Sequence, residues 1–123
     1  MAEHQHIQLN PTERTLYRLF LAHPKGIRAD DLVLHWDELC AIYAEESIYD
    51  DPELRADKME SLCAESKKVF YANISRIKRK FRASLGARQA QKLIIKRDKN
   101  GVYRISGLQR ASAGALDTIP YGL

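Results

Sequence analysis

The sequence predicts a mainly α-helical domain that ends in one β-hairpin. Apolar residues recur at steps of three and four through most of the chain, which is the spacing of one helix face. An Asn-Gly pair at Asn100 and Gly101 stands between two short β-prone runs, a pattern typical of a tight hairpin turn. At 123 residues the chain is long enough for one hydrophobic core and too short for two. We therefore expect one domain over residues 1–106, followed by a flexible or packing tail over residues 107–123.

The first helix is expected to begin directly after Asn10. This residue is a favourable N-cap, Pro11 suits the first helical position, and Glu13 can complete a capping box with Asn10. The helix should end before Pro24, because the residue that precedes a proline is pushed out of the α region. An extended segment is expected to follow at Ile27.

Two acidic helices are expected next. Asp30 or Asp31 should cap a helix that fades near Ser47. Asp51 is followed by a proline, which suits the first position of a third helix over residues 52–64. Whether this third helix is separate from the next one is left open, since neither glycine nor proline lies between them.

The fourth helix is expected over about residues 67–85, after a weak break and a cap at Ser66. Its apolar residues recur at steps of 4, 3, 4 and 4 and form one stripe: Phe70, Ile74, Ile77, Phe81 and Leu85. Gly86 can close the helix, and residues 87–91 can add a further turn. Strands are then expected at residues 93–95 and 102–105.

This order of elements is that of a winged helix-turn-helix. Three or four helices precede one tight hairpin, and in that fold the helix before the hairpin enters the major groove of DNA. We therefore expect the helix at about residues 67–85 to be the recognition helix. Residues 93–106 are expected to form the wing.

The charges are divided sharply along the chain. Residues 1–65 contain six Lys and Arg against fourteen Asp and Glu, a net charge of −8. Residues 66–104 contain thirteen Lys and Arg against a single acid, Asp98, a net charge of +12. Charge distribution governs partners more than fold, so the basic half indicates a polyanionic partner.

The basic half predicts binding to double-stranded DNA by a transcriptional regulator. At 100° per residue, Arg76 and Arg79 lie opposite the apolar stripe, and we expect both to read bases, since arginine matches the O6 and N7 atoms of guanine. Six further residues are expected to contact phosphate: Lys68, Ser75, Arg82, Lys96, Arg97 and Lys99. A homodimer is expected, because half-sites are commonly paired.

Two other functions remain open. The chain can be a protein-interaction module on the same fold, since a fold does not define a function. The acidic region at residues 30–65 would then be the surface for a protein partner, or an autoinhibitory surface that covers the basic half. Structured RNA is a third candidate, because it attracts the same charges without groove reading.

No motif indicates an enzyme, a cofactor or a metal. The sequence has no phosphate-cradling glycine loop, nucleophile elbow or zincin motif. His4 and His6 have no third ligand near them in the sequence, and Cys40 and Cys63 are expected to be buried thiols. Neither a signal peptide nor a membrane-spanning run is visible, so a cytoplasmic protein is expected.

Parts of the chain resemble the C-terminal DNA-binding domain of the OmpR/PhoB response regulators. ANISRIKRKF followed by LIIKRDKNGVYRIS is similar to the recognition helix and wing of that family, and LNPTERTLYRLF resembles its opening. The resemblance implies a winged helix that binds double-stranded DNA, with Arg76 and residues 78–80 as the basic run and residues 103–105 as the wing strand. TERTLYRLFLAHPKGI and HWDELCAIY also resemble a set of small bacterial proteins, which implies the fold but no activity.

Overall fold

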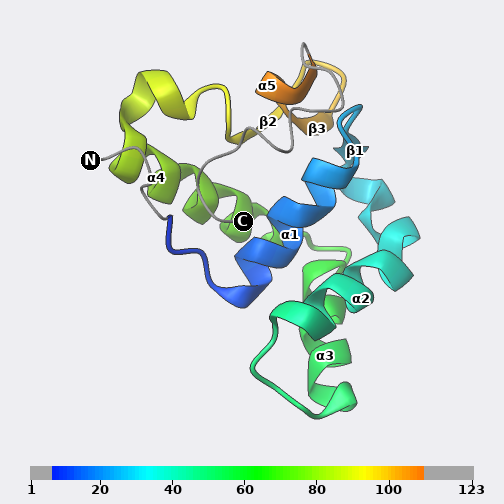
Figure 1. The fold of residues 1–123 in the computed structure, drawn as a ribbon. Coiled ribbons are helices and arrows are strands. Elements are labelled where there is room, and N and C mark those ends of the chain that lie inside the picture. Colours follow the sequence, from blue (N-terminus) through cyan, green and yellow to red (C-terminus); the bar gives the residue numbers. More distant parts are fainter. Residues whose placement is uncertain (1–6, 110–123) are drawn as a thin grey trace.

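The computed structural model describes residues 7–109 and is mainly helical, with a small antiparallel sheet (Figure 1). Its elements are α1 (Pro11–Ala22), β1 (Ile27–Arg28), the 3-10 segment η2 (Ala29–His35), α2 (Trp36–Glu46), α3 (Pro52–Leu62), α4 (Lys68–Ala90), β2 (Ile95–Arg97), β3 (Val102–Ile105) and α5 (Ser106–Gln109). The predicted mainly α class with a hairpin near the C-terminus is confirmed.

α1 begins with the predicted capping box. The Glu13 amide donates to Asn10 Oδ1 at 2.9 Å, and the Asn10 amide donates to Glu13 Oε1 at 3.0 Å. α1 contacts both α2 and α4, and it buries Leu16, Tyr17, Leu19 and Phe20 completely. The Tyr17 hydroxyl donates to the carbonyl of Leu93, which ties the approach to β2 to this helix. α1 is therefore the element around which the core is built.

The second helix differs from the prediction. A 3-10 segment precedes α2, and neither Asp30 nor Asp31 caps a helix, because η2 begins after Arg28 and α2 begins after His35. Asp30 instead forms an ion pair with Lys67 at the start of α4, with 2.7 Å between Oδ1 and Nζ. A cation from a distant segment has replaced the local amide as the partner of this carboxylate.

α3 and α4 are separate helices, which answers a question that the sequence leaves open. Asp51 caps α3 as predicted, and its Oδ1 accepts from the Glu53 amide at 2.9 Å. The predicted break near Ser66 is also present, but Lys67 is the N-cap of α4 and has a positive φ of 61°. Ser66 Oγ lies 3.5 Å from the Lys68 amide, so the left-handed residue makes the break and the serine adds little.

The inner face of α4 is rotated slightly from the predicted stripe. Its fully buried residues before the bend are Phe70, Asn73, Ile77 and Phe81. Asn73 has taken the deepest position from Ile74, and both Ile74 and Leu85 are only half-buried. Gly86, with φ 81° and ψ 158°, interrupts the helix as predicted, and one further turn extends to Ala90.

The sheet has the strand order β1-β3-β2, with both pairings antiparallel. The extended segment predicted at Ile27 is β1, and Ile27 pairs with Tyr103. β2 starts two residues later than predicted, because the amides of Leu93 and Ile94 are bonded to the carbonyl of Ala90 at the end of α4. The pairing of β1 with β3 joins segments 75 residues apart and was not predicted.

Both cysteines are free thiols, half-buried against the core, rather than fully buried as predicted. Burial raises the pKa of each thiol. α5 begins at Ser106, the last residue of the predicted domain, and extends into the predicted tail, whereas residues 110–123, His4 and His6 lie outside the described residues.

We predict that Gly26→Ala destabilises the protein more than Gly86→Ala. Both glycines have a positive φ, which costs a residue with a Cβ about 1–3 kcal/mol. A Cβ on Gly26 would also lie 2.5 Å from Val102 Cγ1 and 2.6 Å from the Tyr103 carbonyl, whereas a Cβ on Gly86 meets nothing within 4 Å. Crowding at Gly26 should add about 1–3 kcal/mol. Urea unfolding measures the difference. Equal losses in the free energy of unfolding would contradict the close packing of the turn at Gly26 against β3.

Candidate nucleic-acid interface

The outer face of α4 carries exposed polar and cationic side chains. Lys68, Ser75, Arg79 and Arg82 are exposed, on the side of the helix opposite Phe70, Asn73, Ile77 and Phe81. Within residues 7–109 none of the three cations in this set forms an ion pair. Their predicted orientation away from the core is confirmed, and their charge is not neutralised by the described part of the chain.

Arg76 has a different position from the one predicted. It is half-buried, and its Nε donates to Glu13 Oε2 at 2.9 Å, while Lys80 Nζ donates to Glu13 Oε1 at 2.6 Å. Arg76 therefore points along the α1 side of α4 and does not share the outer face with Arg79. The angle of 100° per residue placed it about 60° from the centre of that face, which is close enough for a buried acid to capture it.

The Glu13 carboxylate is completely buried and fully bonded. Burial acts to raise its pKa, but the hydrogen bonds from Lys80, from the Asn10 amide and from Arg76 outweigh burial, and the pKa is lowered. The carboxylate is therefore ionised in the folded protein. Two cations of the basic half are committed to holding α4 against α1.

Asp98, the single acid of the basic half, is bonded entirely within the hairpin. Asp98 Oδ1 accepts from the amides of Asn100 and Val102, and Asp98 Oδ2 pairs with Arg104. These backbone hydrogen bonds, led by the one from Val102, lower the pKa of Asp98. Since this carboxylate is occupied within the turn, it leaves the neighbouring hairpin cations unneutralised.

All three hairpin cations were expected at the tip of the wing, but only one of them lies there. Lys96 and Arg97 belong to β2 itself, and only Lys99 lies in the turn. Among the described residues none of the three forms an ion pair. Arg28 of β1 also reaches the turn and donates to the carbonyl of Asn100, a contribution to this surface that sequence reasoning missed.

A groove separates α4 from the hairpin and joins their cations in one surface. Its volume is about 410 Å³. Its lining residues are Ile74, Ser75, Lys78, Arg82, Gln91, Ile94, Ile95, Lys96, Arg97 and Tyr103. Four of these are Lys or Arg and none is acidic. Lys78 is exposed and lines this groove.

The acidic helices do not cover this groove. Glu46 of α2 accepts from Arg14 and Arg18 of α1, so its charge is neutralised within the acidic half. α3 lies at the end of the molecule remote from the hairpin (Figure 1). Among the described residues, the acidic half forms ion pairs with α4 and its N-cap through Glu13 and Asp30.

No protein-family model, no curated protein and no solved structure matches the chain. The resemblance to response-regulator domains therefore stays a prediction. Over residues 7–109, none of the helices has both the length and the apolar character needed to span a membrane.

The two arginines of α4 should differ in their effect on stability. Arg76→Ala removes a donor from a buried carboxylate, and we expect the free energy of unfolding to fall by about 1.5–3 kcal/mol. Arg79→Ala should change it by less than about 0.5 kcal/mol, because Arg79 is exposed. Chemical denaturation of the two variants measures this difference, and equal losses would show that Arg76 is not held by Glu13.

The ion cluster at Glu13 should make stability depend on pH. Because folding lowers the pKa of Glu13, its contribution is complete above the ordinary glutamate pKa and is lost as the pH falls through the lowered value. Glu13→Gln should lower the free energy of unfolding by about 1.5–3 kcal/mol at pH 7. It should also make that free energy depend less on pH in the acidic range. Glu45→Gln is the control, since its side chain is 66% exposed. Parallel pH curves for the wild type and Glu13→Gln would contradict the assignment.

Proposed function

We propose that this protein binds double-stranded DNA as a winged helix-turn-helix, with α4 as the recognition helix and the β2–β3 hairpin as the wing. The order α1, β1, α2, α3, α4, β2, β3 and the strand order β1-β3-β2 support this proposal. In this class of protein the helix before the hairpin enters the major groove, and the hairpin reaches the neighbouring backbone.

The observation that carries the proposal is the acid-free cationic groove between α4 and β2. Lys78 and Arg82 line it from the helix, and Lys96 and Arg97 line it from the strand. Cations on two adjacent elements that share one hollow suit a phosphate backbone, which carries its charges in a continuous row.

The residues of this surface have different roles in the proposal. Arg79 reads bases, because it is exposed on the outer face of α4 and its guanidinium can bind guanine in two places. Arg76 is a positioning residue, since Glu13 holds its guanidinium. The phosphate contacts come from Lys68, Ser75, Lys78, Arg82, Lys96, Arg97 and Lys99.

Fluorescence anisotropy with mixed-sequence duplex DNA at about 50 and 200 mM salt tests the proposal. If about five phosphates are neutralised, the logarithm of the binding constant should fall with the logarithm of salt at a slope of about −4 to −5. Lys99→Ala should weaken all sequences alike and reduce that slope by about 1, whereas Arg79→Ala should alter sequence preference.

Lys58→Ala is the matched control, because Lys58 is an exposed cation on α3, remote from the hairpin. It should leave the affinity unchanged. Absence of binding at both salt concentrations would refute the proposal, and so would an equal loss in Lys58→Ala and Lys99→Ala.

A protein-interaction surface at the turn between α2 and α3 is the second candidate. Ile48 is 80% exposed and Leu54 is 45% exposed, and the intervening residues include Asp50 and Asp51. An exposed apolar patch with an acidic rim suits a basic amphipathic helix. Titration with a model peptide of that kind tests this candidate, and Ile48→Ser with Leu54→Ser should abolish any binding.

A further inference from the structure

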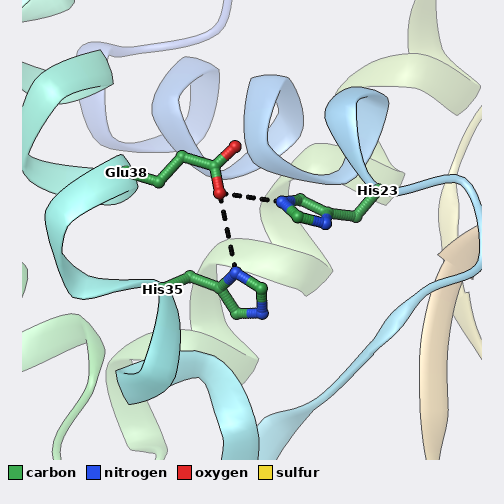
Figure 2. Close-up of side chains that lie close together, drawn as sticks. All are labelled: His23, His35 and Glu38. Carbon is green, nitrogen blue, oxygen red and sulfur yellow. Dashed lines mark hydrogen bonds and ion pairs between the residues drawn. The ribbon is translucent and has the colours of Figure 1, made fainter.

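Three side chains with metal-ligating atoms meet where α1 ends and α2 begins. His23 is the C-cap of α1, His35 directly precedes α2, and Glu38 lies in the first turn of α2. His23 Nε2 lies 2.8 Å from Glu38 Oε1, and His35 Nδ1 lies 3.6 Å from the same oxygen (Figure 2). The three donor atoms all lie within 4.8 Å of one another.

Two backbone segments position these groups. The His23 amide donates to the Phe20 carbonyl at 3.2 Å, and the His23 carbonyl accepts from the Gly26 amide at 2.8 Å. His35 and Glu38 stand three residues apart at the start of α2, a spacing that places side chains on one helix face. The two imidazole rings contact each other edge to face, with 4.6 Å between their centroids. The cluster is therefore held by two backbone segments, the end of α1 and the start of α2, and by the contact between its two rings.

The donor set and its spacing fit a zinc-type cation. Zinc binds imidazole nitrogen at about 2.0–2.1 Å and carboxylate oxygen at about 2.0–2.2 Å, so tetrahedral ligand atoms lie roughly 3.3–3.5 Å apart. The two distances to Glu38 Oε1, 2.8 and 3.6 Å, lie on either side of that spacing. Two nitrogen donors disfavour magnesium and calcium, which prefer oxygen ligands.

The cluster is also open to solvent on one side. The side chains of His23, His35 and Glu38 are 31%, 25% and 39% exposed. This degree of exposure provides an entry path for a cation and room for water as a fourth ligand. Three protein ligands with an open fourth position are the usual arrangement of catalytic zinc sites, whereas structural zinc sites are closed.

We propose that His23, His35 and Glu38 form a binding site for one zinc-class divalent cation, with the fourth position left to water. The proposal departs from the sequence-based expectation of no metal, which did not bring His23, His35 and Glu38 together. It does not depend on DNA binding. A bound cation would join the end of α1 to the start of α2 and stabilise the corner that contains β1 and η2.

Titration of the full chain, freed of metal by chelator, tests the site directly. Zn²⁺ should bind with a stoichiometry of one by calorimetry, and saturating Zn²⁺ should raise the Tm by at least about 5 °C. Bound Co²⁺ should show the intense visible bands of a four-coordinate site, and Mg²⁺ should cause neither effect. His35→Gln and His23→Gln should each weaken Zn²⁺ binding by more than about tenfold.

The double variant His4→Gln/His6→Gln is the control, because these histidines are alternative ligands that the proposal does not use. It should keep the full affinity for Zn²⁺. The proposal is overturned if this control loses binding while His23→Gln keeps it, or if the wild type binds no Zn²⁺. Imidazole ¹⁵N resonances of the wild type provide a second measurement that needs no variant: Zn²⁺ should shift Nε2 of His23 and Nδ1 of His35, and unchanged resonances would refute the site.

Discussion

The Glu13 carboxylate is the constraint on which the arrangement of the helices depends. It closes the capping box of α1 and accepts from Arg76 and Lys80 of α4 while completely buried. A buried charge is costly unless it is paired and hydrogen-bonded, so α1 and α4 are confined to the register that brings these donors together. The same α1 helix bonds the carbonyl of Leu93 through Tyr17, which places the hairpin relative to α4.

This constraint divides the cations of α4 into two groups, those that pair with Glu13 and those that remain exposed. Arg76 and Lys80 neutralise a buried acid, whereas Arg79 and Arg82 remain exposed on the outer face of α4. The net charge of the basic half therefore overstates what a partner can contact. The cations that remain free are concentrated on the outer face of α4 and on the hairpin, and the groove between these two elements is lined by four of them, Lys78, Arg82, Lys96 and Arg97.

α1 also connects the two proposed sites. Glu13 lies near its first turn and His23 at its end, which corresponds to about 15 Å along the helix axis. The ion cluster at one end orients the surface proposed to bind DNA, and the histidine cluster at the other end joins α1 to α2. The two clusters lie on the same helix and share no side chain.

The sequence by itself determined the features that depend on neighbours a few residues apart. The capping box at Asn10, the cap at Asp51, the interruption at Gly86 and the turn at Asn100 are all where local chemistry predicts them. The outward orientation of Arg79 also follows from helical periodicity alone.

Only the tertiary structure decided which distant groups meet. Arg76 is 63 residues from the acid that holds it, and His23 is 15 residues from Glu38. Asp30 does not cap a helix as expected; packing places Lys67 Nζ 2.7 Å from its Oδ1 instead. Such contacts depend on how whole elements pack in space, and the spacing of residues within one element carries no information about that packing.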